Sequence, residues 1–174
     1  MERYAVIEGG TVENIAVADA EFASAQGWIA CADDVAPGWT YDGEAFAAPV
    51  VPLDDLKAAL WTEAKALRDA AIDAGVDVAG IGRFDSDPAS RGNINGAVTM
   101  ALVAASTGQP FEISWRLADN SVTTLSGAQM IAVGVAVGQH VAACHAAAQA
   151  IGIAIPAAAD RSALATIDIG AGWP

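Results

Sequence analysis

Positively charged residues are scarce in this 174-residue sequence, which has 8 Lys and Arg against 21 Asp and Glu and a net charge of −13. Proteins bind nucleic acids and anionic membrane surfaces through clusters of cations, which displace counterions from phosphates or attract lipid headgroups. The sequence offers no such cluster. We therefore expect neither nucleic acid nor an anionic membrane surface as the main partner.

Cysteine and histidine are also rare, with two of each. Cys31 and Cys144 lie far apart and form no Cys-x-x-Cys pair, so neither a metal knuckle nor a disulfide framework is implied. His140 and His145 are five residues apart, whereas a metal-binding pair on a helix needs a spacing of three or four. Cys144 and His145 resemble a nucleophile and its base, but adjacent helix positions point about 100° apart. We expect no metal, no cofactor and no catalytic role for these residues.

Charge is absent altogether between Asp119 and Asp160. A transmembrane helix needs about 20 predominantly apolar residues. Polar residues interrupt this stretch and alanine fills much of the rest, so we expect a helix buried by neighbouring helices and no membrane span. Hydrophobic residues make up 54% of the sequence, and many of them are alanine, which buries little surface per residue. We therefore expect a thin core in which helices approach closely, and this core could be formed in part by other copies of the chain.

The first 48 residues are predicted to form a small β-rich module. Two β-prone runs around Gly9-Gly10 predict one hairpin, and two shorter runs around Asp42-Gly43 predict another. The module carries nine acids and Arg3 as its single base. Pro49 and Pro52 make the following connector extended and stiff, so we divide the chain into a module of residues 1–48 and a domain of residues 49–174.

The second region is predicted to be an α+β domain in which three main helices alternate with short antiparallel hairpins. Helices are expected at residues 53–74, 88–106 and 126–149, with a short one at 160–167. Asp87 before Pro88 is typical of a helix cap and first helical position, and Ser126 with Gln129 predicts a capping box. Hairpins are expected at residues 76–84 and 111–125.

The densest polar cluster is Asp85-Ser86-Asp87, followed by Ser90-Arg91. Paired acids can hold a divalent cation or perform acid–base chemistry. The same residue types also begin helices, with Asp87 as the cap and Arg91 balancing the acids. We favour the structural interpretation and leave open an ion bound by Asp85 and Asp87.

Enzyme motifs are missing from the sequence, which has no P-loop, dinucleotide-binding loop or serine nucleophile elbow. We therefore do not expect an enzyme. The tryptophans are scattered and are interpreted as packing anchors, while contact of any one of them with a sugar stays open. They are Trp28, Trp39, Trp61, Trp115 and Trp173.

Two sets of short motifs resemble proteins of tailed bacteriophages. The first set is similar to the small β-rich opening of many tail and tail-fibre-associated proteins, and comprises Tyr4–Ile15, Gly27-Trp28 and Gly38–Phe46. The second set resembles an uncharacterised domain of phage and prophage tail proteins. It comprises Phe84–Asp87, Ser90-Arg91, Trp115, Asp119-Asn120, Leu125–Met130 and Gly172–Pro174.

This resemblance implies a virion structural protein of the distal tail, in a fibre, baseplate or tail tip, assembled in the cytoplasm of the host bacterium. It implies no catalytic residue. The expected partners are other tail proteins, one of which would dock the module of residues 1–48, and a glycan of the host surface is left open. A tail-fibre assembly chaperone absent from the finished virion is the first alternative, and a carbohydrate-binding or hydrolytic enzyme is the second.

Tail tips are commonly threefold or sixfold assemblies, so we expect a homotrimer. Either of two apolar faces, one on the first and one on the third main helix, is expected to lie near its axis, although the first is equally typical of ordinary core packing. These faces consist of Leu53, Leu56, Leu60 and Leu67 on the first helix, and of Met130, Val133, Val137 and Val141 on the third.

Overall fold

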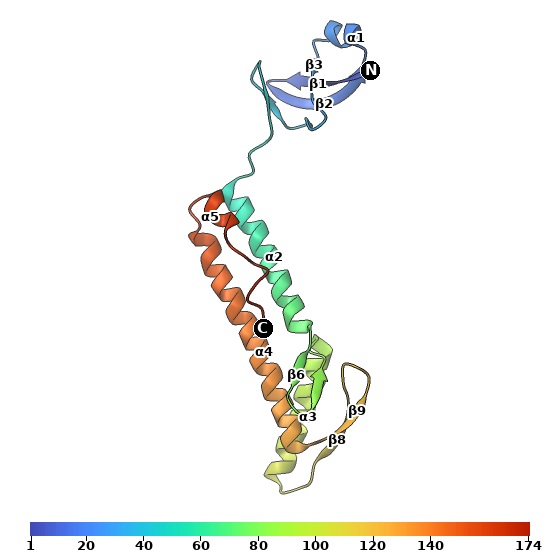
Figure 1. The fold of residues 1–174 in the computed structure, drawn as a ribbon, viewed down its shortest axis with the longest axis vertical. Helices are drawn as coiled ribbons and strands as arrows, with labels where there is room; N and C mark the ends of the chain where they lie inside the picture. The colour runs from blue at the N-terminus through green and yellow to red at the C-terminus, as the bar shows by residue number, and fades with distance from the viewer. The chain divides into compact units, whose positions relative to one another are not determined.

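Short antiparallel hairpins alternate with helices along the whole chain, which confirms the α+β class (Figure 1). The computed structural model describes all residues, 1–174. The chain divides into two units, Met1–Pro52 and Leu53–Pro174. The predicted boundary between residues 48 and 49 lies at the start of the proline connector that ends the first unit.

The first unit is a five-stranded antiparallel sheet in the order β3-β1-β2-β4-β5. Gly9 and Gly10 join β1 to β2 with φ angles of 57° and 82°, which only glycine adopts freely, and so form the predicted hairpin turn. The core is small and contains the buried side chains of Ala5, Val12 and Val35. The elements are β1 (Glu2–Glu8), β2 (Thr11–Ala18), α1 (Ala20–Ala25), β3 (Ile29–Ala30), β4 (Thr40–Tyr41) and β5 (Phe46–Ala47).

Arg3, the only base of the first unit, is engaged inside that unit. Its Nη2 donates a hydrogen bond to the carbonyl oxygen of Val35 at 2.9 Å, and its Nε lies 3.7 Å from the carboxylate of Asp33. The acids of the unit therefore dominate its surface charge.

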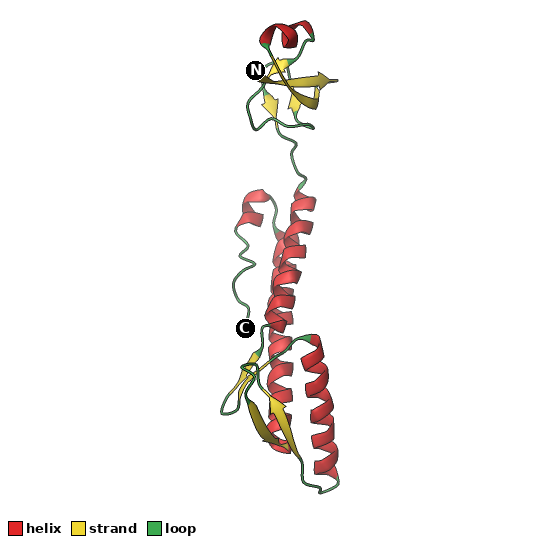
Figure 2. Ribbon diagram, turned by 90° about the vertical axis from the view of Figure 1, so that its right-hand side faces the viewer, coloured by secondary structure: helices red, strands yellow, loops and turns green.

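The second unit is built on two antiparallel helices, α2 and α4, which lie side by side (Figures 1 and 2). At one end of the pair, Lys57 Nζ donates to the carbonyl oxygen of Pro156 at 3.1 Å, and toward the other end His140 Nε2 lies 2.9 Å from the carbonyl oxygen of Ala71. The elements of this unit are α2 (Leu53–Asp73), β6 (Val76–Val78), β7 (Gly82–Phe84), α3 (Pro88–Ser106), β8 (Glu112–Arg116), β9 (Val122–Ser126), α4 (Gly127–Ala157) and α5 (Arg161–Ala165).

The helix starts follow the caps that the sequence predicts. Asp87 Oδ1 accepts hydrogen bonds from the backbone N–H groups of Ala89 and Ser90 and caps α3. Ser126 and Gln129 form the reciprocal capping box of α4. Both predictions are confirmed, because a cap depends on residues within one helical turn.

The contact between α3 and α4 shows the close approach that an alanine-rich sequence predicts. Ala97 and Ala101 of α3 are buried there. Gly134 of α4 faces Val98, and a Cβ atom at position 134 would lie only 2.6 Å from Val98 Cγ2. Figure 2 shows α3 along one half of α4, with the hairpins β6–β7 and β8–β9 at the same end of the unit.

Helix α4 is longer than predicted, since it ends at Ala157 rather than near Gln149. The reason is the position of Pro156, which stands in the last turn of the helix. A proline removes one N–H bond and crowds the carbonyl group four residues earlier, here that of Gly152, and this disruption is smallest at a helix end. Beyond α4, the tail brings Leu164, Ile169 and Trp173 onto a second core between α2 and α4.

Helix α4 is long and apolar enough to cross a membrane, judged by length and composition alone. Within this chain it packs against α2 and α3. The expectation that neighbouring helices bury it holds for one face only, because only 22% of its most apolar window is buried.

Candidate functional site

The predicted interface residues of α4 lie in the core of the chain itself. Met130 and Val133 have no exposed surface, and Val137 is 5% exposed. They pack with residues of β7, α3 and β9, including Phe84, Ile94 and Leu125, while Val141 is half-buried. These side chains have little surface left to offer a second copy.

The predicted interface residues of α2 also have partners inside the chain. They are half-buried and pack on the second core, against Ile151 and Ile155 of α4 and Leu164 of α5. Ordinary core packing, the alternative that the sequence left open, therefore describes their contacts. These residues are Leu53, Leu56, Leu60 and Leu67.

The opposite face of α4 is exposed and carries no charge. Its exposed residues repeat at alternating steps of four and three, the spacing of a coiled-coil seam. Alanine dominates, with Val135 and Ile153 as the large apolar members, 53% and 67% exposed. We call this set the α4 seam; it consists of Ala128, Ala132, Val135, Gln139, Ala142, Ala146, Gln149 and Ile153.

Most of the polar cluster at residues 85–91 is structural. The buried Ser86 hydroxyl donates to the carbonyl oxygen of Ile72 at 2.6 Å and accepts from the N–H of Gly75 at 2.9 Å, which closes the end of α2. Arg91 forms an ion pair with Asp73 at 2.8 Å. The predicted role of Asp87 as a cap is confirmed, and its hydrogen bonds with the Ser90 hydroxyl and backbone hold the pKa of its carboxyl below the ordinary value.

Asp85 is the member of this cluster that remains free. It is exposed, and its carboxylate has no hydrogen-bond or ion-pair partner in the chain. No group of three or more His, Cys, Asp or Glu side chains is arranged to hold a metal ion. Since Asp87 is occupied by the helix cap, the structure does not pair it with Asp85 as an ion site.

The tip of the β8–β9 hairpin docks beside Asp85 through a close contact with β7. The N–H of Ala118 donates to the carbonyl oxygen of Arg83 at 2.9 Å. Leu117 packs over Gly82, where a Cβ atom would lie 2.7 Å from Leu117 Cδ1. Arg116 donates to the carbonyl oxygen of Asn120 at 3.0 Å and braces the hairpin turn. The tip is therefore held by backbone, packing and side-chain contacts together.

A pocket of about 240 Å³ lies between this hairpin tip and the start of α3. Six of its seven lining side chains can form hydrogen bonds, and those of Asp85, Asn93 and Asn120 have no partner in the chain. The pocket joins two motifs that the sequence singled out separately. We call it the hairpin pocket; its lining is Asp85, Ser90, Asn93, Trp115, Arg116, Leu117 and Asn120.

Sequence reasoning identified part of this lining and missed the rest. Asp85, Ser90, Trp115 and Asn120 belong to the phage-like motifs, whereas Asn93 and Arg116 carried no signal of their own. Asn93 follows Ser90 by three residues and so lies on the same face of α3, which the predicted helix could have indicated. Arg116 lines the pocket only because of the way in which the β8–β9 hairpin docks, and the spacing of residues in the sequence does not show this docking.

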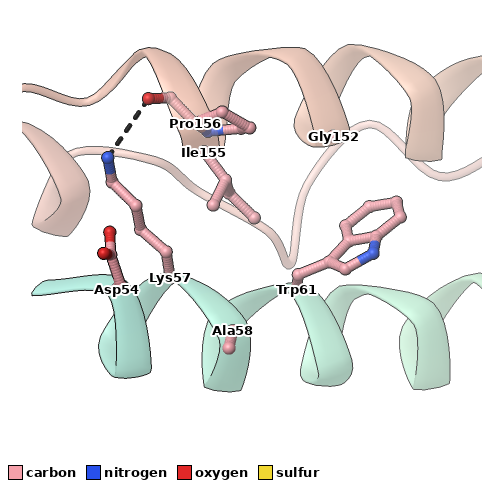
Figure 3. A pocket seen from close by; sticks show the side chains of 7 residues that line it. All are labelled: Asp54, Lys57, Ala58, Trp61, Gly152, Ile155 and Pro156. Carbon is pink, nitrogen blue, oxygen red and sulfur yellow. Dashed lines mark hydrogen bonds between the residues drawn. The ribbon is translucent and has the colours of Figure 1, made fainter.

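A second hollow lies between the start of α2 and the end of α4 (Figure 3). Its cationic residue, Lys57, is already engaged in a hydrogen bond within the chain. Lys57 reaches across to the carbonyl oxygen of Pro156, as a cation does at a helix C-terminus. Trp61 packs over Gly152, where a Cβ atom would lie 3.1 Å from the indole ring. This hollow of about 420 Å³ is a helix-packing groove with one free acid, Asp54, at its edge.

The histidine within hydrogen-bonding distance of the Cys144 sulfur is His140, one turn before it on α4, and not the adjacent His145. The Cys144 thiol is fully buried, and this burial raises its pKa, which disfavours the reactive thiolate. His140, one turn away, lies 3.8 Å from the sulfur and 2.9 Å from the carbonyl oxygen of Ala71. His145 is exposed on another side of the helix, as its spacing predicts.

Residues 55–171 match a protein family described as a domain of unknown function, DUF4376. The match covers more than half of the chain, including all of the hairpin pocket and the α4 seam. No curated protein matches the sequence, and no solved structure matches it either.

Proposed function

This chain belongs to the DUF4376 family, whose function is unknown, and we propose that it is a structural protein of the distal tail of a bacteriophage, assembled from identical copies. It would form part of a fibre, baseplate or tail tip after assembly in the host cytoplasm. The motifs of both units resemble tail proteins. The observation that carries the proposal is the α4 seam, an exposed surface of heptad spacing without a single charge.

A second copy of the chain fits this seam better than another occupant. The net charge of −13 opposes self-association, yet no acid lies on the seam, so copies can approach there without burying a charge. Gln139 and Gln149 occupy seam positions at which their amides can bond across an axis and fix the register. In a bilayer the same amides would be costly to bury.

The size of the seam favours more than two copies. Its 26 residues span about 38 Å at 1.5 Å per residue, and a stripe about 10 Å wide offers on the order of 400 Å² per copy. Two copies would then bury about 800 Å² in total, below the roughly 1,200 Å² of stable specific interfaces. In a trimer each copy contacts two neighbours, which is the arrangement that we propose.

The first unit would dock to another tail protein. It has nine acids against Arg3, and that base is already engaged by Val35 and Asp33. A partner surface rich in Lys and Arg would complement it.

Light scattering of the purified chain at micromolar concentration tests self-assembly. We expect a trimer that Ala142→Glu on the seam converts to monomer, because three buried carboxylates would face one another. Ala66→Glu, at an exposed alanine of α2, is the matched control and should leave the trimer intact. A clean monomer for the unmodified chain would contradict the proposal, as would binding to neutral lipid vesicles that Ala142→Glu abolishes.

Mass spectrometry of purified particles tests the place in the virion. A tail protein is retained in finished particles at a fixed ratio to the other tail proteins, whereas an assembly chaperone is absent from them.

A further inference from the structure

We infer that the hairpin pocket binds one neutral pyranose ring of a polysaccharide. This inference deepens the proposed function and rests on it for the biological setting, since a tail protein with such a pocket would contact sugars of the host surface. The binding itself follows from the lining of the pocket and is argued from that lining alone.

The hydrogen-bonding groups of the pocket suit a polyhydroxylated ligand. A pyranose presents adjacent hydroxyls, each of which both donates and accepts, so it needs acceptors and donors side by side. The carboxylate of Asp85 accepts, while the amides of Asn93 and Asn120 do both. These three side chains have no partner in the chain, so a ligand can use them without breaking an existing bond.

Trp115 supplies the apolar surface that a sugar ring also needs. Its ring packs against Phe84 with a centroid distance of 6.4 Å, so the core fixes its orientation, while its partly exposed side lines the pocket. The indole N–H has no acceptor in the chain. A rigid indole offers a flat C–H-binding face and one polar donor, a combination typical of sites that are apolar on one side and wet on the other.

The charges of the pocket disfavour anionic ligands and divalent cations. Asp85 and Arg116 are its only charged residues, so its lining is neutral overall. A phosphate or an acidic sugar would meet the Asp85 carboxylate and a chain of net charge −13. A divalent cation would find a single free carboxylate in a lining that also contains the cationic residue Arg116. A neutral ligand avoids both penalties.

The volume limits the ligand to about one ring. At about 240 Å³ the pocket is smaller than the roughly 300–1,000 Å³ of sites for drug-sized molecules. A ligand of a dozen heavy atoms in such a site binds with a Kd of about 1–10 mM. In a trimer, three equivalent pockets on one polysaccharide would raise the apparent affinity without any new contact.

An NMR titration of the full-length ¹⁵N-labelled chain tests the inference. The five tryptophans give five indole N–H signals, and the signal lost in Trp115→Phe identifies the pocket. Methyl glycosides of glucose, galactose, mannose and N-acetylglucosamine are the probes, added to about 50 mM, well above the expected Kd. We expect at least one of them to shift the Trp115 signal with saturation.

Two variants and a matched control locate the binding. Asp85→Ala and Asn93→Ala each change an exposed side chain without a partner, so both should fold normally and bind about tenfold and about fivefold more weakly. Asp54→Ala removes the free acid at the groove of Figure 3 and should leave the affinity unchanged. Glucuronate and inorganic phosphate should bind more weakly than the neutral sugars.

The inference is overturned if no neutral glycoside shifts the Trp115 signal, if Asp85→Ala and Asp54→Ala have equal effects, or if phosphate or a peptide such as triglycine binds in preference. Light scattering of the same samples separates this outcome from failure of the proposed function. A trimer that binds no sugar contradicts only the inference, whereas a monomer that binds sugar contradicts only the proposed assembly.

Discussion

The two faces of α4 are both uncharged, yet they differ in the size of their side chains. The inner face carries Met130, Val133 and Ile151 and is buried by other parts of the chain, while the outer face is mostly alanine and glutamine. Large apolar side chains gain more from burial than alanine does, so they decide which face turns inward. In a helix without charges, side-chain volume rather than polarity therefore indicates orientation.

The largest expected difference between the two faces of α4 is in the stability lost when one large side chain on each face is shortened to alanine. Met130→Ala should lower the free energy of unfolding by about 2–5 kcal/mol, because Met130 is fully buried and its removal leaves a cavity. Val135→Ala should cost less than about 0.5 kcal/mol when it and its reference both carry Ala142→Glu, the seam variant expected to be monomeric, because Val135 is 53% exposed in the single chain. Urea denaturation measures both. Equal losses would contradict the orientation of α4. Without Ala142→Glu, the loss caused by Val135→Ala should be larger, because the proposed trimer buries the α4 seam between copies.

Two glycines of α4, one turn apart, allow the two sides of the helix to be compared by adding a single methyl group to each. Gly134→Ala should destabilise the chain by about 1–3 kcal/mol, because the new Cβ would lie 2.6 Å from the stiff side chain of Val98. Gly138→Ala should stabilise it by about 0.5–1 kcal/mol, since no atom lies within 4 Å of the new Cβ and alanine favours a helix. Thermal melts of the two variants should move in opposite directions. A shift of the same sign in both would show that α3 does not pack closely on α4.

The smallest expected effect concerns the start of α3, which covers part of the inner face. The pKa of Asp87 is lowered by its hydrogen bonds, so its charged form stabilises the folded state. This contribution is complete above its ordinary pKa of 3.8 and is lost as the pH falls through the lowered value. Asp87→Ala should therefore lower the Tm by about 3–5 °C at pH 7 and by less at pH 3. Asp85→Asn is the control and should change the Tm at neither pH, whereas a pH-independent effect of Asp87→Ala would contradict the role of the charge.

Local structure was largely predictable from the sequence. The hairpin at Gly9-Gly10, the cap at Asp87 and the capping box at Ser126 each depend on residues within a few positions, and the structure confirms all three. The α+β class follows from the succession of such signals. The end of α4 was not predictable in the same way, because a proline disturbs only its own N–H bond and the preceding turn, so a helix can run past the expected end and include Pro156 in its last turn.

Contacts between distant segments were not predictable. The sequence predicted an apolar face on α4 that includes Met130, Val133 and Val137. It does not show that β7, α3 and β9 cover this face. The hairpin pocket combines Asp85 with Asn120, whose proximity depends on the docking of Leu117 over Gly82. Such proximity arises from tertiary packing, which a single sequence records only as unconnected motifs.

The uncharged character of α4 also determines how proteases act on this chain. Trypsin cleaves after Arg116 and next after Arg161, and enzymes that require an acidic residue find none between Asp119 and Asp160. The exposed helix is thus resistant to charge-directed digestion even when its backbone is accessible. In a tryptic peptide map it would emerge as one long, largely apolar fragment, so its detection in particles is best supported by chymotryptic peptides or by peptides from the remainder of the chain.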